Sequence, residues 1–188
     1  MTTLAKICGL STADTVAAAL EGGAAFVGFV FFAKSPRNLA PATAARLAEP
    51  ARGRAKVVAV TVDPTDAELD AITAALGPDL IQLHGRETPE RAAAAYETVA
   101  NHLMFDARPP AGSDLPGGVG ARFDWDLLQG RRFTRPWFLA GGLSSDNISE
   151  AIGRSGAPLV DVSSGVETAP GLKDPGLISA FLTAVRSA

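Results

Sequence analysis

Short apolar runs alternate with alanine-rich segments along most of the chain, and this alternation limits the possible folds more than any other feature. The apolar runs occupy residues 4–8, 26–31, 57–62, 80–84, 102–106, 137–140 and 159–163. Segments with helical spacing lie between most of them, at residues 13–20, 42–47, 66–76 and 147–152. Near-continuous apolar strands that alternate with helices are typical of parallel βαβ units whose sheet is covered on both faces.

Polar residues and glycines gather where these strands end. The residues in question are Cys8, Asp63, His84, Asp106, the pair Gly141-Gly142 and the run Ser163-Ser164-Gly165. In open α/β sheets and in barrels alike, this edge of the sheet carries the active site. The sequence has no G-x-G-x-x-G after the first strand and no G-x-x-x-x-G-K-[ST], so a dinucleotide or triphosphate site has no support. These observations favour a (β/α)8 TIM barrel of the α/β class.

The strand count does not fill such a barrel. Seven strands are predicted where eight are needed, and residues 84–102 leave room for one helix, at residues 89–100, but for no strand. The 188 residues are also fewer than the ~200–250 usual for the fold. We therefore expect one domain over residues 1–188, with the fifth βα unit missing or shortened.

Composition excludes several classes of partner. Hydrophobic residues make up 47% of the chain and charged residues 20%, as in globular proteins, and the net charge of −3 comes without a basic stripe for nucleic acid. No apolar run is long enough to cross a membrane or to form a signal peptide. The single cysteine cannot form an internal disulfide or a zinc knuckle, and nothing in the spacing of His84 suggests a metal site. We expect a cytoplasmic protein, monomeric by default with a dimer possible.

Two glycine-rich loops are candidates for binding phosphate. Gly141 and Gly142 stand between a strand and a helix start, and Ser163, Ser164 and Gly165 follow the next strand. Glycine lets backbone N–H groups approach an anion, and a helix N-terminus adds partial positive charge. The last two strands of a barrel often carry such a site. Each loop alone could also be an ordinary tight turn.

Arg37 lies in a proline-containing loop directly after the second strand. A guanidinium group held there could grip a carboxylate through two parallel hydrogen bonds. The competing interpretation is a solvated loop cation.

Asp124 stands between Phe123 and Trp125, after a glycine-rich run at residues 116–120 that is typical of a mobile lid. Desolvation by the two aromatic rings could make the carboxyl group a general acid. An aspartate before a helical segment is also an ordinary N-cap, and both descriptions can hold for one residue.

Lys6 and Cys8 are two residues apart on the first strand and so face the same side of the sheet. If that side is the barrel interior, the Lys6 ammonium group would favour a thiolate at Cys8. The competing interpretation is that Cys8 packs as a small buried hydrophobe. His84 could likewise be a core histidine or a loop ligand.

Several motifs taken together, in order, resemble the phosphoribosylanthranilate isomerase family. They are KICG at 6–9, GFVFF at 28–32 with SPR at 35–37, QLHG at 82–85, FDW at 123–125, AGGL at 140–143 and DVSSGVE at 161–167 with GLKD at 171–174. The resemblance implies a (β/α)8 barrel that converts N-(5-phosphoribosyl)anthranilate to 1-(2-carboxyphenylamino)-1-deoxyribulose 5-phosphate, in tryptophan biosynthesis. The reaction is an Amadori rearrangement without a cofactor.

The resemblance also implies roles for single residues. The catalytic pair falls on Cys8, as general base, and Asp124, as general acid; Arg37 would bind the anthranilate carboxylate. His84 and Asp106 would lie near the substrate. The phosphate would be held by Gly141, Gly142, Ser163, Ser164 and Gly165.

Two alternatives remain open at this stage. One is another phosphate-binding barrel isomerase or epimerase, and the other is a non-catalytic phosphosugar-binding remnant that lost its activity with the missing unit. A deletion that opens a barrel exposes strand edges and costs more than a typical stability margin of about 5–15 kcal/mol. The missing unit is therefore better explained by a stretch omitted from the sequence than by a true deletion.

Overall fold

The computed structural model describes residues 2–86, 101–107 and 122–188 of the chain. Its seven main strands are β1 (Leu4–Cys8), β2 (Phe26–Phe31), β3 (Lys56–Thr61), β4 (Leu80–Leu83), β5 (Leu103–Phe105), β6 (Trp137–Leu139) and β7 (Leu159–Val162). The helices are α1 (Ala13–Glu21), α2 (Pro41–Ala48), α3 (Asp66–Leu76), α5 (Ile148–Ser155) and α6 (Pro175–Ser187). Short 3-10 turns, η1 (Glu49–Ala51), η2 (Trp125–Leu128) and η3 (Ser164–Val166), and a hairpin of β8 (Glu167–Ala169) and β9 (Leu172–Lys173) complete the described part.

All seven predicted strands and all four helices predicted at residues 13–20, 42–47, 66–76 and 147–152 are confirmed, with small shifts at their ends. The α6 helix and the β8–β9 hairpin were not anticipated. The helix expected at residues 89–100 and the lid expected at residues 116–120 lie outside the described residues. Within the described residues, no helix has the length and apolar character needed to span a membrane.

Local signals explain where the helices begin and end. Thr12 caps α1 by accepting a hydrogen bond from the Thr15 amide, and Thr65 forms a capping box with Glu68 at the start of α3. The α3 helix ends at Gly77, whose left-handed backbone suits glycine. At α5 the N-cap is Asn147, whose side chain bonds to the preceding loop and not to the helix.

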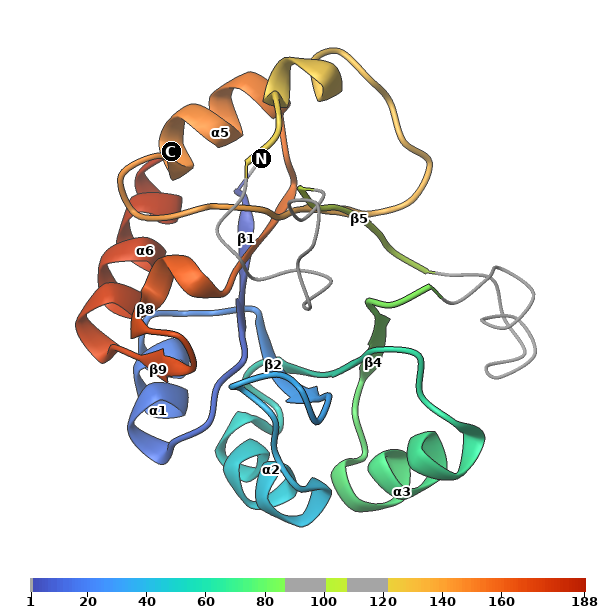
Figure 1. The fold of residues 1–188 in the computed structure, drawn as a ribbon. Helices are drawn as coiled ribbons and strands as arrows, with labels where there is room; N and C mark the ends of the chain where they lie inside the picture. The colour runs from blue at the N-terminus through green and yellow to red at the C-terminus, as the bar shows by residue number, and fades with distance from the viewer. Residues whose placement is uncertain (1, 87–100, 108–121) are drawn as a thin grey trace.

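The strands form one parallel sheet in the order β4-β3-β2-β1-β7-β6-β5. The expected (β/α)8 barrel, with its fifth βα unit missing or shortened, is wrong: the described strands form an open, seven-stranded half-barrel sheet. Among the described residues, β4 pairs only with β3 and β5 only with β6, and the two lie on opposite sides of a gap (Figure 1). The physical reason is that the described residues include no βα unit to bridge the two ends of the sheet. Side chains of β4 and β5 nevertheless meet across this gap, since Gln82 Nε2 lies 3.3 Å from Met104 Sδ.

The strand alternation divides the core in two. Ile7, Val27, Phe29, Leu139 and Val160 point outward to the helices, which surround the curved sheet (Figure 1). The alternate residues point inward and form a smaller apolar cluster, made of Cys8, Phe26, Val30, Val58, Val60, Phe138 and Leu159. Among the described residues, the outward side of the strands is covered by the apolar core, so we look for polar groups that could meet a ligand on the inner face.

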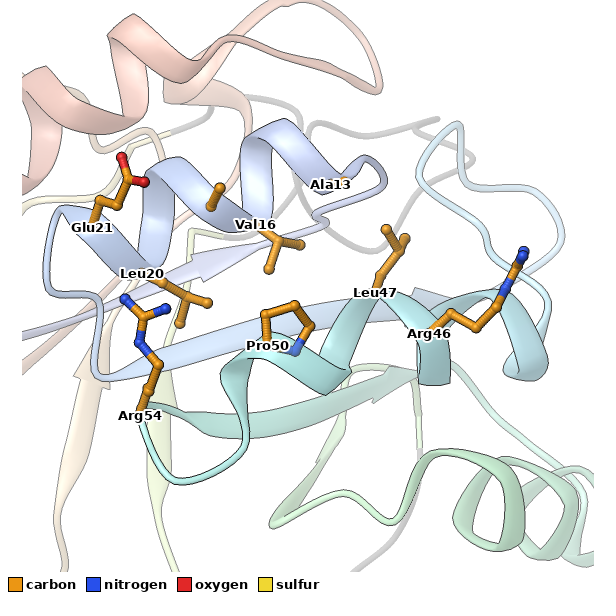
Figure 2. Close-up of a pocket in the computed structure, with 9 residues that line it drawn as sticks. Ala13, Val16, Leu20, Glu21, Arg46, Leu47, Pro50 and Arg54 are labelled. Atoms are coloured by element: carbon orange, nitrogen blue, oxygen red, sulfur yellow. The ribbon is translucent and has the colours of Figure 1, made fainter.

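A pocket lies on the helical side of the molecule, between α1 and the segment formed by α2 and η1 (Figure 2). Ala13, Val16, Leu20, Leu47 and Pro50 supply much of its lining, with charged side chains of Glu21, Arg46 and Arg54 at its margin. Every residue expected to bind substrate is absent from this lining. The pocket is thus a feature of helix packing, separate from the candidate site.

Candidate active site

The candidate site begins with Cys8, at the end of β1 on the inner face of the sheet. Its Cα pairs in register with Gly28 of β2, and the residue is 6% exposed. A Cβ atom at Gly28 would lie 3.2 Å from Lys6 Cε and 3.4 Å from Cys8 Sγ. Glycine on β2 therefore leaves the space that the Lys6 stem and the Cys8 thiol occupy.

Lys6 is buried on the same face, with 1% of its surface exposed. Its Nζ donates hydrogen bonds to Asp161 Oδ1 at 2.9 Å and to Gln82 Oε1 at 2.8 Å. Burial by itself lowers the pKa of Lys6, but the charges of Asp161 and Cys8 raise it to about 12. The lysine is therefore a fixed positive charge. The predicted placement of Lys6 and Cys8 on one side is confirmed.

Burial raises the pKa of the Cys8 thiol. The ammonium groups of Lys6 and Lys173 oppose this effect, whereas the Asp161 carboxylate adds to it. The expectation that Lys6 favours the thiolate is correct in direction, but desolvation outweighs it in this structure. Removing a thiol from water costs more when it is ionised, which explains the sign.

Asp106 and His84 continue this polar group across the gap in the sheet. His84 Nε2 lies 3.6 Å from Asp106 Oδ2, and His84 Nδ1 lies 3.2 Å from Gln82 Nε2. Burial raises the pKa of Asp106, and the nearby Asp161 charge adds to this, whereas His84, the Ala107 amide and Lys6 act in the opposite direction. Asp106 is thus a partly buried carboxyl group in the same electrostatic environment as Lys6 and Asp161.

Asp124 does not belong to this polar group. Its side chain is 62% exposed, caps η2 by accepting a hydrogen bond from the Asp126 amide, and forms an ion pair with Arg154 of α5 at 3.1 Å. The N-cap expectation is confirmed, but the desolvation expected from Phe123 and Trp125 is absent. The structure therefore does not bring Asp124 together with Cys8.

Arg37 is buried rather than solvated, with 6% exposure. Its Nε and Nη2 atoms donate to the two carboxylate oxygens of Glu167, each at 2.7 Å. This is the two-bond grip predicted for Arg37, made here to a carboxylate of the chain itself. The Arg37 side chain also lies over Gly9, where a Cβ atom would come within 2.6 Å of Arg37 Cδ.

Glu167 joins Arg37 to Lys173, because the Lys173 ammonium group contacts Glu167 and also donates to the Ser163 carbonyl oxygen at 3.1 Å. Burial alone would raise the pKa of Glu167, but the hydrogen bonds from Arg37 and Lys173 hold it below its usual value. The cluster thus carries two cations and one anion beside the loop that follows β7.

The two glycine loops lie against each other. A Cβ atom at Gly165 would come within 1.8 Å of the Leu143 carbonyl oxygen, so the loop at 163–165 touches the loop at 141–144. Gly141 and Gly142 both adopt positive φ, at 89° and 60°. Asn147 braces the turn, since its Nδ2 donates to the Gly142 carbonyl oxygen and its Oδ1 accepts from the Ser144 amide.

Gly141 also links this region to Asp106, because a Cβ atom at Gly141 would lie 2.9 Å from Asp106 Oδ1. The loops expected to bind phosphate and the partly buried carboxyl group are therefore neighbours. Among the described residues, no group of three or more His, Cys, Asp and Glu side chains could hold a metal ion.

Sequence reasoning missed three contributors to this region: Asp161, Glu167 and Lys173. A usable signal existed for Asp161, which is in register with Lys6 on the adjacent β7 and has the parity of the inner face. The motifs at 161–167 and 171–174 contain Glu167 and Lys173, but no local pattern shows their pairing with Arg37 and Ser163, which the β8–β9 hairpin brings about.

Comparisons with known proteins identify the family of this chain. The family model described as N-(5'phosphoribosyl)anthranilate (PRA) isomerase matches residues 5–102 and 90–184. The chain belongs to this family. It is 61% identical to the N-(5'-phosphoribosyl)anthranilate isomerase of Caulobacter vibrioides, over 210 aligned positions that cover 98% of this chain and 96% of the relative.

Solved structures of the family are also similar. The phosphoribosyl anthranilate isomerase from Thermotoga maritima has a TM-score of 0.86 at 28% identity, covering 99% of this chain and 100% of that one. A complex of the isomerase with reduced 1-(o-carboxyphenylamino)-1-deoxyribulose 5-phosphate has a TM-score of 0.83 at 28% identity, with coverage of 99% and 100%. Monomers of the dimeric Thermotoga maritima isomerase give a TM-score of 0.81 at 26% identity, with the same coverage.

The alignment with the Caulobacter relative also measures the missing unit. It spans 210 positions, whereas this chain has 188 residues, so at least 22 positions of the relative have no counterpart here. The two overlapping segments that match the family model meet at residues 90–102, between β4 and β5. The shortfall therefore falls where the sheet is open.

Proposed function

We propose that this chain isomerises N-(5'-phosphoribosyl)anthranilate to 1-(2-carboxyphenylamino)-1-deoxyribulose 5-phosphate, a step of tryptophan biosynthesis. Family membership supports the reaction. The observation that carries the proposal is a group of polar side chains linked across the inner face of the sheet beside Cys8: Lys6, Asp161, Gln82, His84 and Asp106. The substrate of this chain is accordingly a small phosphoribosyl compound.

The reaction needs an acid first. Protonation of the furanose ring oxygen lets the bond from C1 to that oxygen break, while the anilino nitrogen lone pair forms a C1=N Schiff base. Asp106 supports this role because burial raises its pKa, so its protonated form is more populated than that of a solvated aspartate. We propose Asp106 as the acid in place of Asp124, whose exposed carboxylate is paired with Arg154.

A base then removes the proton from C2, which the Schiff base has made acidic. The electrons form an enolamine, which gains a proton at C1 and relaxes to the ketone. Cys8 as the thiolate is the proposed base, because it lies on the inner face and has Lys6 and Lys173 nearby. Each acid or base group of this kind contributes on the order of 10²–10⁴-fold to the rate.

Substrate binding follows from the two loop regions. Arg37, held in place by Glu167, is the proposed partner of the anthranilate carboxylate. The adjoining loops with Gly141, Gly142, Ser163, Ser164 and Gly165 are the proposed phosphate site, next to the Lys173 ammonium group. We propose a monomer for this chain, with a dimer as the alternative that the dimeric relative suggests.

The test is the loss of phosphoribosylanthranilate fluorescence when purified protein is added. We expect a rapid loss that Cys8→Ser reduces by at least ~10²-fold while leaving the circular dichroism spectrum unchanged. A near-normal rate in Cys8→Ser would contradict the role of the thiol.

One structural observation favours a second candidate, a non-catalytic phosphosugar-binding remnant: β4 and β5 do not pair with each other within the described residues. Folded wild-type protein that binds a phosphosugar but causes no loss of fluorescence would place this candidate first.

A further inference from the structure

Lys6 and Cys8 are both buried on β1, and the neighbouring strands fix where their side chains lie. Both side chains point to the inner face, and Gly28 of β2 leaves the space that they share. The positive charge of the Lys6 ammonium group acts to lower the pKa of the Cys8 thiol, against the effect of burial. The lysine is therefore placed to act on the thiol directly.

Two groups hold the Lys6 ammonium in this position. Asp161 on β7 accepts from Nζ at 2.9 Å, and Gln82 on β4 accepts at 2.8 Å. Asp161 and Lys6 are also in register on paired strands, so the ion pair belongs to the sheet itself and not to a mobile loop. A lysine with 1% exposure cannot exchange these partners for water without local unfolding.

We propose that Lys6 is a positioning residue that sets the ionisation of Cys8, and that Asp161 limits its effect, so that the two charges act on the thiol in opposite directions. The inference rests on the proposed role of Cys8 as the base. Lys6 stabilises the thiolate as a nearby cation, and Asp161 destabilises it as a nearby anion.

Other groups that act on Cys8 come from the hairpin after β7. Lys173 on β9 is a second cation near the thiol. Glu167 on β8 pairs with both Lys173 and Arg37 and so partly neutralises the two cations. Asp106 after β5 and His84 after β4 belong to the same polar group but act more remotely, through Lys6, Gln82 and Asp161. Lys6 and Asp161 are thus the two charges whose separate removal gives the clearest readout.

The experiment is a pH titration of the thiolate by its ultraviolet absorbance near 240 nm. The chain contains one cysteine, so subtraction of a Cys8→Ser titration leaves the signal of Cys8 alone. Removing a charge within about 4–6 Å moves a pKa by about 1–3 units. We expect Lys6→Met to move the titration at least about one pH unit higher, and Asp161→Asn to move it lower, because asparagine keeps the hydrogen bond to Lys6 but not the charge.

Two further variants separate charge from structure. Lys6→Arg keeps the positive charge and should leave the titration close to that of the wild type. Lys56→Met removes a lysine that is 63% exposed on β3, and should not move the titration at all. Circular dichroism at each pH establishes that the protein remains folded.

Turnover gives a second readout. Catalysis requires Cys8 ionised and Asp106 protonated in the same molecule, so at neutral pH the rate should fall in Lys6→Met by the factor by which its thiolate fraction falls. That deficit should shrink as the pH rises through the thiol pKa of the variant. A merely structural role for Lys6 would give a loss that does not depend on pH.

The outcomes are distinguishable from failure of the proposed function, because the absorbance titration needs no turnover. If Lys6→Met does not fold, Asp161→Asn still tests the inference through the opposite shift. A titration unchanged in either folded variant, or one that moves in the same direction in both, would overturn it. Shifts as expected in a protein without isomerase activity would uphold the inference about Cys8 and reject the proposed function.

Discussion

The inner and outer faces of the sheet are made by the same strands but have different chemistry. On β1, Ile7 faces outward into a continuous apolar core, and its neighbours Lys6 and Cys8 face inward. On β7, Val160 and Val162 face outward, and Asp161 faces inward to Lys6. A period of two residues is enough to separate the two faces completely.

The difference shows where stability and chemistry reside. Outward residues gain from burial alone, at about 25 cal/mol per Å² of apolar surface. Charges on the inner face lose hydration and are retained with partners, as Lys6 is with Asp161 and Gln82. A buried ion pair is weak evidence for stability, so a function for the inner charges explains them better than a stabilising role.

The largest expected effect concerns the proposed acid, Asp106, and tests whether the chemistry resides on the inner face. We expect Asp106→Asn to lower turnover by ~10²–10⁴-fold, because the inner carboxyl group can no longer donate a proton. Asp124→Asn is the matched control on the outside, and its rate should stay within a few-fold of the wild type. The fluorescence assay measures both. The opposite ranking would return the acid to Asp124 and mean that the inner face lacks the proton donor.

A smaller effect is expected from Phe29 on β2, which faces the helices and is fully buried. Phe29→Ala should lower the free energy of unfolding by about 3–5 kcal/mol, through lost burial and the cavity left behind. Urea denaturation followed by circular dichroism measures the change. Turnover per folded molecule should remain close to the wild type, and a loss as deep as that of Asp106→Asn would show that the two faces are not independent.

The smallest effect concerns two lysine–aspartate ion pairs whose nitrogen–oxygen distances are nearly equal. Lys6–Asp161 is buried at 2.9 Å, whereas Lys56–Asp79 is largely exposed at 3.0 Å. Lys56→Met should change the free energy of unfolding by no more than about 1 kcal/mol, since water screens the exposed pair. Thermal unfolding of Lys56→Met and Lys6→Met tests whether the contribution of each pair to stability depends on its burial and not on its nitrogen–oxygen distance. Equal losses in both would contradict this.

Much of the fold could be predicted from sequence because it depends on local patterns. The seven strands follow from short apolar runs, and the common side of Lys6 and Cys8 follows from strand geometry. The position of the missing unit was also predictable, since residues 84–102 leave too few residues for a further strand. Closure of the barrel was predicted wrongly, because closure depends on whether the two ends of the sheet meet in space.

The candidate site divides in the same way. The sequence by itself determined the elements, the glycine loops and the position of Cys8, since each depends on residues close together in the chain. Only the tertiary structure decided that Asp106 is partly buried and Asp124 exposed. Asp124 has aromatic neighbours in sequence but points to Arg154, whereas Asp106 has no special neighbours in sequence but packs against Gly141 and faces His84. Burial and charge environment come from segments distant in the chain, and these set the pKa of an acid.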